Sequence, residues 1–390
     1  MRVEERRVNW EILDAWRDAA AECGIPKIKE FNRGDNFGNA YFQMNQRKGV
    51  RWSATKAYLR PAQSRSNLTI LTNTHVEQIK LDDSDNGLRA VGIKVQRGRE
   101  DSEYFSSEKE IILSAGTVGS PQILQLAGIG PETLLNQNNI PLLADLPGVG
   151  ENLHDHLQVR SVYRVENTIT LNQKAKTLFG KASMGLEYFL FKTGPLTMPP
   201  SQLGAFAKSD PQQKTANIEW HVQPLSLEKF GDPLHTFNAI TPSVCNLRPT
   251  SRGNVQIKSS DPMDYPAIRL NYLSTIADEK VAVEGLRLTR KIMSAKALQE
   301  FNPQEWKPGL GIQSEEQLLE SARDLGTTIF HPVGTCKMGN DKLAVVNDRL
   351  QVHGVKSLRV IDASIMPQIT SGNTNAPTVM IAEKGAAFIL

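Results

Sequence analysis

The sequence contains no apolar run that approaches the roughly 18 to 20 residues needed to cross a bilayer. It also lacks a strong charge of either sign, because 45 Lys and Arg stand against 42 Asp and Glu and the formal net charge is +3. No dense Lys/Arg block occurs, so we expect neither a nucleic-acid nor an anionic-membrane partner. The first seven residues are charged and no apolar stretch follows them, which is not the pattern of a secretory signal.

Cysteine is scarce as well. The three cysteines, Cys23, Cys245 and Cys336, lie far apart and have no metal-ligand spacing. Reduced thiols are therefore expected rather than a structural disulfide, as in a cytosol-like compartment. We expect a cytoplasmic or peripheral membrane protein that needs no metal.

The sequence also lacks Gly-x-Gly-x-x-Gly, the turn between a strand and a helix that holds the pyrophosphate of a dinucleotide. Three Gly-x-Gly sequences occur, but Thr133, Leu153 and Ser314 stand where the third glycine would be. We interpret all three as turns. Any dinucleotide site in these residues therefore depends on other features.

Length and composition indicate a folded protein with more than one domain. The 390 residues suffice for two domains with sizeable cores. The hydrophobic share of 39%, with 28 glycines, is near the globular average and does not indicate disorder. Long polar loops and isolated strands distinguish the middle of the chain, so we predict three segments: 1–160, 161–326 and 327–390.

Apolar spacing and turn residues predict the elements of the first segment. We expect a helix over 10–23, strands over 68–71, 76–81 and 90–95, and a turn over 82–87. A strand over 110–113 should precede a helix with Ser120 as N-cap, Pro121 at its first position and Gly128 at its end.

The carboxyl-terminal region has the pattern of a ligand site. A strand over 358–362 ends at Asp362-Ala363-Ser364, where an acidic residue and small neighbours let a ligand approach the backbone. A turn over 371–377 leads into a helix that begins at Pro377. The unpaired N–H groups and the positive dipole end of this helix suit an anionic ring.

Three separated motifs in this region occur in the order and spacing of a known family. They are His331-Pro332-x-Gly334-Thr335, Val360-Ile361-Asp362-Ala363-Ser364 and Gly372-Asn373-x-Asn375. Together they resemble the carboxyl-terminal signature of the glucose–methanol–choline (GMC) flavin oxidoreductases, in particular its choline dehydrogenase-like and alcohol dehydrogenase-like members.

The resemblance implies a mixed α/β fold and FAD as cofactor. Residues 1–160 would be the first part of an FAD-binding domain, without its dinucleotide fingerprint, and 161–326 a substrate-binding lobe with an antiparallel sheet and helices. Residues 327–390 would carry the catalytic segment and return to the FAD-binding domain. The matched region corresponds to the later two-thirds of a family member, so we expect a fragment of a longer protein.

The resemblance also implies roles for single residues. His331 and Asn375 would be catalytic, the first as general base and the second as a hydrogen-bond donor to the developing alkoxide. The implied cofactor contacts come from Val76, through its main chain, and from Asp362, Ala363, Asn373, Thr374 and Pro377. Structural roles are the alternatives: Val76 as a buried strand residue, Asp362 as a turn residue and Asn375 as a helix cap.

The implied reaction is oxidation of a CH–OH donor, a small-molecule alcohol that is choline-like or otherwise primary, to a carbonyl. Histidine suits removal of the hydroxyl proton because its unperturbed pKa, about 6.5, is near working pH. The hydride needs an organic acceptor, which flavin N5 supplies. The electron acceptor, oxygen, quinone or another compound, stays open. The alternatives are a flavin-poor fragment without activity and a hydroxynitrile lyase on the same scaffold.

Two further groups of residues allow more than one interpretation. His154-Asp155-His156 is compatible with a metal site, but no third ligand cluster is near it in the sequence. A similar stretch in the family fixes a turn beside the flavin, and we expect that structural role here. Trp220, His221 and Phe206 either line a substrate pocket or pack in the core of the substrate lobe.

Overall fold

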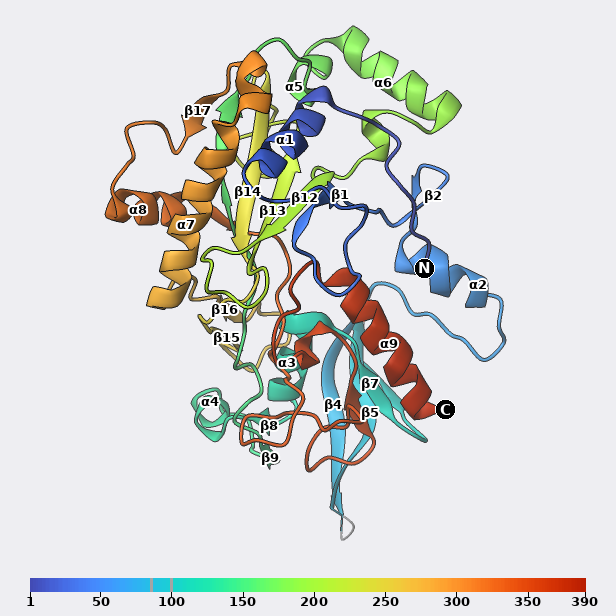
Figure 1. The fold of residues 1–390 in the computed structure, drawn as a ribbon. Helices are drawn as coiled ribbons and strands as arrows, with labels where there is room; N and C mark the ends of the chain where they lie inside the picture. The colour runs from blue at the N-terminus through green and yellow to red at the C-terminus, as the bar shows by residue number, and fades with distance from the viewer. Residues whose placement is uncertain (85–86, 99–100) are drawn as a thin grey trace. The chain divides into compact units, whose positions relative to one another are not determined.

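The computed structural model describes residues 1–84, 87–98 and 101–390. These residues form two compact units, each assembled from separate stretches of the chain (Figure 1). Unit 1 contains residues 1–69, 157–247 and 276–327, and unit 2 contains 70–156, 248–275 and 328–390. The mixed α/β class expected from the sequence is confirmed.

Unit 1 is built on an eight-stranded sheet. Six strands follow the order β1-β12-β13-β14-β10-β18, β11 also pairs with β14, and β17 pairs with β11. The strands are β1 (Gly38–Tyr41), β10 (Leu157–Arg160), β11 (Val162–Arg164), β12 (Leu203–Ala207), β13 (Ile218–Gln223), β14 (Ala239–Asn246), β17 (Gln304–Lys307) and β18 (Gly326–Thr328). The pairs β1–β12, β12–β13 and β13–β14 are antiparallel. The antiparallel sheet expected in the substrate lobe is therefore present.

Helices α1 and α7 cover one face of this sheet (Figure 1). Trp220 of β13 packs against Trp16 of α1, with ring centroids 6.4 Å apart, and its indole N–H donates to Thr289 Oγ1 of α7 at 2.8 Å. Trp220 is fully buried. The sequence allowed either a pocket wall or core packing for Trp220, and these contacts are core packing.

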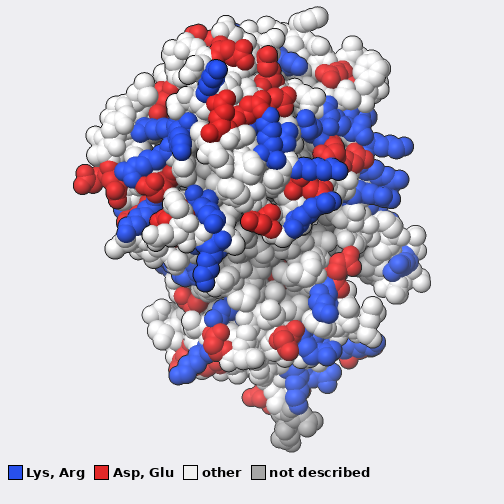
Figure 2. All heavy atoms as spheres, in the orientation of Figure 1, with Lys and Arg blue, Asp and Glu red and all other residues white. Residues whose placement is uncertain are grey.

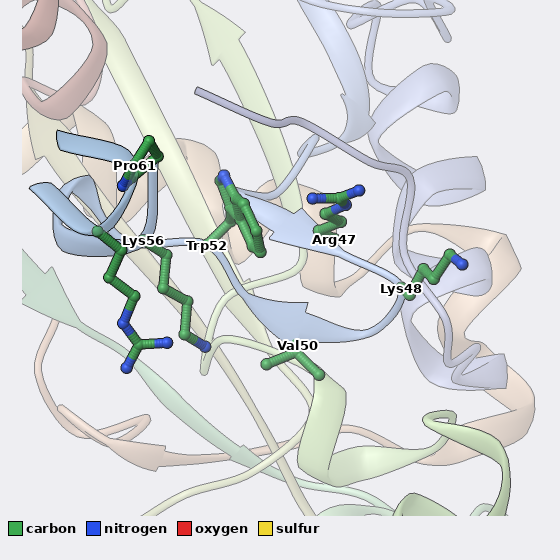
Figure 3. Close-up of a pocket in the computed structure, with 7 residues that line it drawn as sticks. Arg47, Lys48, Val50, Trp52, Lys56 and Pro61 are labelled. Carbon is green, nitrogen blue, oxygen red and sulfur yellow. The ribbon is translucent and has the colours of Figure 1, made fainter. Parts of the chain in front are cut away.

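The helices of unit 1 are α1 (Glu11–Glu22), α2 (Arg60–Ala62), α5 (Leu171–Lys174), α6 (Leu178–Phe191), α7 (Ile276–Met293) and α8 (Glu315–Leu325), with short turns η1 (Thr55–Leu59), η2 (Pro195–Thr197) and η3 (Lys296–Phe301). A small hairpin, β2 (Gln46–Arg47) and β3 (Val50–Arg51), lies beside a hollow of about 660 Å³ (Figure 3). Arg47 stacks over Trp52 in its wall, at 4.9 Å from the ring centroid.

Unit 2 combines a three-stranded antiparallel sheet with a parallel pair of strands. Its strands are β4 (Thr74–Ser84), β5 (Gly87–Arg97), β6 (Glu103–Ser106), β7 (Ile111–Leu113), β8 (Ile129–Gly130), β9 (Ala144–Asp145), β15 (Asn254–Gln256), β16 (Ala267–Arg269) and β19 (Leu358–Val360). Its helices are α3 (Gly116–Leu126), α4 (Glu132–Gln137) and α9 (Asn375–Ile389), with the turn η4 (Ala363–Ile365). The parallel partners β7 and β19 come from opposite ends of the unit's sequence, so their pairing fixes the carboxyl-terminal motifs beside α3.

Charged side chains of both signs lie near one another over the face drawn in Figure 2. Cys23, Cys245 and Cys336, all in the described part of the chain, form no disulfide bonds. No helix among the described residues is long and apolar enough to cross a membrane.

The compact units differ from the three segments predicted from the sequence. The boundaries expected near 160 and 326 are close to those observed, but residues 1–69 pack with the sheet of unit 1 and 248–275 pack with unit 2. In unit 2, Leu153 and Gly253 exchange two backbone hydrogen bonds of 3.0 and 2.8 Å. These are contacts between distant residues, which local composition does not reveal.

Two of the predicted elements were wrong. Residues 68–71 do not form a strand. The first strand after them, β4, begins at Thr74. Helix α3 begins at Gly116, so Ser120 lies inside the helix and does not cap it. The Ser120 hydroxyl donates to Asp362 Oδ2 at 2.6 Å instead. The turn predicted over 82–87 overlaps β4 and β5, and its residues 85–86 lie outside the described part of the chain.

Candidate active site

His331 begins a tightly fixed loop in unit 2. Thr335 Oγ1 donates to Thr117 O at 2.6 Å, and Thr117 Oγ1 donates to Pro332 O at 2.7 Å, which ties the loop to α3. Gly334 has φ of 100°, and a Cβ there would lie 2.5 Å from Asn152 O. Only glycine fits this conformation and this close approach without strain. The His-Pro-x-Gly-Thr motif is therefore the sequence of a fixed loop that presents His331.

His331 is in direct contact with a second histidine, His156. Their Nδ1 atoms are 3.1 Å apart, and the two rings meet edge to face with centroids 5.3 Å apart. His156 is fully buried and His331 is half-buried. A short contact between two ring nitrogens requires one to donate a hydrogen and the other to accept it. The two imidazoles therefore hold each other in defined tautomers.

The outer nitrogen of His331 has a different neighbour. Asn373 Nδ2 lies 3.4 Å from His331 Nε2. With the amide N–H as donor, Nε2 is the accepting nitrogen, so the ring proton of His331 is on Nδ1 and points at His156. In this tautomer the Nε2 lone pair of His331 is available to accept a proton.

The carboxyl group of Asp155 fixes both histidines. Its Oδ1 accepts the backbone N–H of His156 at 2.8 Å and that of His331 at 2.9 Å. Its Oδ2 accepts the hydroxyls of Thr328, at 2.5 Å, and of Tyr272. Burial and this neighbouring Asp155 raise the pKa of the Tyr272 phenol, so the phenol remains a donor. Asp155 is only 2% exposed and accepts four hydrogen bonds from four residues.

Asn375, the second predicted catalytic residue, is the first residue of α9 and is exposed. The amide in contact with His331 Nε2 is that of Asn373, which the resemblance implied as a cofactor contact. Asn373 lies two residues before α9, 42 positions after His331, and contacts His331 directly. The role of Asn375 toward a substrate stays a prediction.

Asp362 caps the turn η4 and joins it to α3. Its Oδ2 accepts from Gly116 N at 2.9 Å and from Ser120 Oγ at 2.6 Å, and its Oδ1 accepts from the N–H and the hydroxyl of Ser364. Both carboxyl oxygens are therefore engaged within the protein. The backbone N–H of the next residue, Ala363, has no acceptor among the residues that the structure describes.

The remaining predicted contacts lie on separate elements of unit 2. Val76 is partly exposed on β4, where it pairs with Val95 of β5. Thr374 is buried, and its carbonyl accepts from Thr378 within the first turn of α9. Pro377 is the third residue of that helix, so it lies in the first turn, where an N–H would be unpaired in any case.

His154 has a structural role. Its Nδ1 contacts Asn152 O at 2.6 Å, and its Nε2 accepts the N–H of Ile369 at 2.9 Å. Burial lowers the pKa of His154 to about 4, with a smaller lowering by Arg252, while the bond to Asn152 acts in the opposite direction. No group of three or more His, Cys, Asp and Glu side chains arranged to hold a metal was found in the described ranges.

The low pKa of His154 predicts how stability depends on pH. Above pH 6.5 the ring is neutral in both the folded and the unfolded chain. Between pH 6.5 and 4 the unfolded chain binds a proton that the folded one does not, so the free energy of unfolding should fall by up to about 3 kcal/mol. Denaturant titrations across this range measure the slope. His154→Gln should reduce it, and an identical slope in the variant would contradict the assignment.

Both ends of the chain match models of one family, GMC oxidoreductase: the amino-terminal model over residues 1–158 and the carboxyl-terminal model over 249–382. The chain is 37% identical over 374 residues to an alcohol dehydrogenase [acceptor] from Pseudomonas putida, covering 95% of this chain and 67% of that protein. The chain belongs to the GMC oxidoreductase family. The family resemblance expected from the carboxyl-terminal motifs is confirmed.

Other relatives agree with this membership. An oxygen-dependent choline dehydrogenase from Pectobacterium carotovorum is 38% identical over 378 residues, covering 96% of this chain and 66% of that one. The structure of pyridoxine 4-oxidase from Mesorbium loti superposes with a TM-score of 0.85 at 28% identity, covering 99% of this chain and 70% of that one. The chain thus spans about two-thirds of these relatives. The cofactor of this GMC oxidoreductase family is FAD, as expected.

Sequence reasoning missed His156 as a neighbour of His331. The two residues are 175 positions apart, and nothing local to either of them indicates their contact. The available signal was the His-Asp-His sequence itself, which was interpreted as a turn or a metal ligand pair. The structure divides it into a structural His154, a connecting Asp155 and a His156 in contact with His331.

Proposed function

We propose that this GMC oxidoreductase oxidises a primary alcohol, choline-like or other, to a carbonyl compound, with His331 as the general base and FAD as the hydride acceptor. The observation that carries the proposal is the pair of contacts on His331. Its Nδ1 meets His156 and its Nε2 meets Asn373, which together favour an unprotonated Nε2. An imidazole nitrogen with a free lone pair in a fixed tautomer is what proton abstraction from a hydroxyl requires.

The chemistry balances with these residues. The alcohol proton moves to His331 Nε2, the C–O bond becomes a C=O bond, and a hydride leaves the same carbon. Bound FAD supplies the acceptor for that hydride, which no side chain can provide. Asn375 would donate a hydrogen bond toward the oxygen on which negative charge develops. Nδ1 of His156 would go on accepting the hydrogen bond from Nδ1–H of His331 when the His331 ring becomes an imidazolium.

Several features of unit 2 fit the cofactor. The Ala363 N–H is available to donate a hydrogen bond to the cofactor at the end of β19. The 15-residue helix α9 offers an N-terminus whose dipole favours negative charge. Asn373, Thr374 and Pro377 would hold the ring's pyrimidine edge at that helix end, while Val76 would contact the adenine through its main chain. For Asp362, four internal hydrogen bonds favour an indirect contribution, in which its carboxyl group fixes the backbone around Ala363.

The absorption spectrum of the purified protein tests the proposal. A bound flavin absorbs near 450 nm, and addition of alcohol without oxygen should bleach that band in an active enzyme, with a carbonyl product in equal amount. Choline, benzyl alcohol and 1-butanol cover cationic, aromatic and aliphatic donors. A colourless protein that takes up no added FAD would support the inactive alternative, for which the absent Gly-x-Gly-x-x-Gly sequence is the specific observation. Cyanide release from a cyanohydrin with an unbleached flavin would support the lyase alternative.

A further inference from the structure

A basic hollow in unit 1 has no part in the proposed oxidation. It has a volume of about 660 Å³ and is lined by the β2–β3 hairpin and by the helical segment of η1 and α2 (Figure 3). Four of its seven lining residues are cationic and none of the seven is acidic: they are Arg47, Lys48, Val50, Trp52, Lys56, Arg60 and Pro61. All of them belong to unit 1, and none is among the residues proposed to hold the flavin or to act as the base.

The β2–β3 hairpin turns one side toward the hollow. Arg47 pairs with Val50 across the hairpin, and residues directly opposite each other in an antiparallel pair point to the same face. Gln46 points to the other face, where it is buried and its amide donates to a backbone carbonyl of η2. Gly49 has φ of 72°, and a Cβ there would collide with Lys192 O. The hairpin is therefore anchored in unit 1 and holds Arg47 at the hollow.

Trp52 orients the Arg47 side chain. The N–H of Trp52 donates to Asn45 O at 2.8 Å, and the Arg47 guanidinium lies 4.9 Å from the centroid of the Trp52 ring. Stacking on an aromatic ring fixes the plane of a guanidinium and uses none of its N–H groups. In the part of the chain that the structure describes, the Arg47 side chain makes no hydrogen bond and no ion pair. Its five N–H donors are therefore available to a ligand.

The helical wall of the hollow carries two cations on one face. Lys56 and Arg60 are four positions apart on the continuous segment of η1 and α2, so their side chains lie on the same side of it. Lys56 is half-buried, and its Nζ donates to Arg51 O at 2.9 Å, which leaves two N–H donors unused. Within the described ranges, neither cation has an acidic partner. Like charges at this spacing repel each other, and a bound anion would relieve that repulsion.

Glu4 contacts the hairpin but does not neutralise the hollow. Its Oε1 accepts the backbone N–H of Lys48 at 2.7 Å, and its Oε2 lies 3.3 Å from Arg7 Nη2. The bond from Lys48 N, supported by Gly49 and Arg7, lowers the pKa of Glu4. The charge of Glu4 is therefore balanced by Arg7, and the four cations of the lining keep their excess of positive charge.

This excess of positive charge favours a ligand with several negative charges in a small volume. A phosphate group carries close to two negative charges at neutral pH, whereas a carboxylate carries one. Two phosphate groups therefore balance four cations, where four carboxylates would be needed. Arginine meets phosphate oxygens with two parallel hydrogen bonds, and lysine binds phosphate as a point charge. A volume of about 660 Å³ is also in the range of small-molecule sites.

We propose that the basic hollow of unit 1 binds a small compound with two or more phosphate groups. Arg47 would contact these groups from the hairpin, and Lys56 and Arg60 would contact them from the helical wall. The proposal goes beyond the oxidation proposed above, because it concerns unit 1 and requires neither a flavin nor His331.

Isothermal titration calorimetry of the full chain tests the proposal. FAD is kept in excess, because its own pyrophosphate has the same chemistry. Pyrophosphate, tripolyphosphate and fructose 1,6-bisphosphate represent adjacent and separated phosphate groups, and sulfate, citrate and choline represent a single dianion, a carboxylate anion and a cation. At least one phosphate probe should bind with saturable heat, at least about tenfold more tightly than each comparison compound. Added salt should weaken this binding.

Three outcomes of the titrations would overturn the proposal. The first is that no phosphate probe binds. The second is that sulfate, citrate or choline binds within about tenfold of the best phosphate probe, since the hollow would then not select phosphate groups. The third is that a phosphate probe binds only when FAD is left out, because the probe would then occupy the flavin's site.

Two variants test the two walls of the hollow. Arg47→Gln and Arg60→Gln each remove a charged donor, so the affinity for the best phosphate probe should fall by about tenfold or more in each. Without ligand, Arg60→Gln should melt at the same or a slightly higher temperature, because its repulsion with Lys56 is lost. Arg60→Gln therefore serves as the test if Arg47→Gln does not fold.

Lys214→Gln is the matched control for net charge. Lys214 is an exposed cation of unit 1 in the connection from β12 to β13, and it does not line the hollow. Its replacement removes the same charge, so affinity should stay within about twofold of wild type. If Arg47→Gln and Arg60→Gln lower the affinity no more than Lys214→Gln does, the cations around the hollow are a solvated surface and the proposal is wrong.

Discussion

Replacement of His331 by alanine should slow the reduction of bound flavin by an alcohol at least about a hundredfold, while the flavin content of the protein stays the same. The reason is that a positioned general base contributes about 10² to 10⁴ in rate, and alanine cannot accept the hydroxyl proton. The flavin content should persist because His331 is not among the residues proposed to hold the cofactor. Anaerobic stopped-flow spectroscopy measures the reduction step directly, without contributions from product release.

His353 provides the control for this variant. It is a half-buried histidine of the same unit whose Nε2 contacts Gly339 O at 3.0 Å, and it has no part in the proposed reaction. His353→Ala should reduce flavin at the wild-type rate. An unchanged rate in His331→Ala would dismiss His331 as the base, whereas added imidazole that partly restores the rate would support it.

The pair with His156 leads to a smaller, distinct effect. His156→Phe keeps a ring but removes the Nδ1 acceptor, so His331 loses the contact that holds its proton on Nδ1. We expect a lower rate of flavin reduction together with an altered pH profile of that rate, because the pKa of His331 depends on its partner. A merely structural role of His156 would lower stability and leave the shape of the pH profile unchanged.

The chemistry of the carboxyl-terminal region could be predicted from the sequence because its signals are local. Gly334 is required by a positive φ, Asp362 ends a strand, and Pro377 lies in the first turn of a helix. Each of these features is set by residues a few positions apart. The strand and the helix of this region were therefore predicted within a few residues of their observed bounds.

The features that were missed all depend on distant contacts. Ser120 has the sequence pattern of a helix N-cap, but α3 starts earlier because Gly116 N and Ser120 Oγ both donate to Asp362, more than 240 positions away. Residues 1–69 join unit 1 because α1 packs on β13 through Trp16 and Trp220. Local patterns determine an element's type, whereas its partners depend on the whole fold.

The second large effect is expected at Asp155. Asp155→Ala removes the acceptor of four hydrogen bonds and leaves buried donors on His156, His331, Tyr272 and Thr328 without a partner. We expect the free energy of unfolding to fall by about 3 to 5 kcal/mol, because each donor left unpaired costs on the order of 1 to 3 kcal/mol and some will find water. Chemical denaturation followed by circular dichroism measures this loss. Asp341→Ala, at an exposed aspartate paired with Lys337, should leave the free energy of unfolding nearly unchanged.

Asp155→Asn separates the stability of this network from its contribution to the reaction. The amide keeps the volume and one accepting oxygen, but its NH₂ group cannot accept from the two donors that face it. If Oδ1 remains the oxygen, the N–H groups of His156 and His331 stay paired, and the lost contacts are those to Tyr272 and Thr328. Stability should then fall by less than in Asp155→Ala, and the rate of flavin reduction should stay within about tenfold of wild type because His331 keeps its position. A rate as low as that of His331→Ala, in a variant that remains folded, would instead show that the charge of Asp155 acts on the base itself.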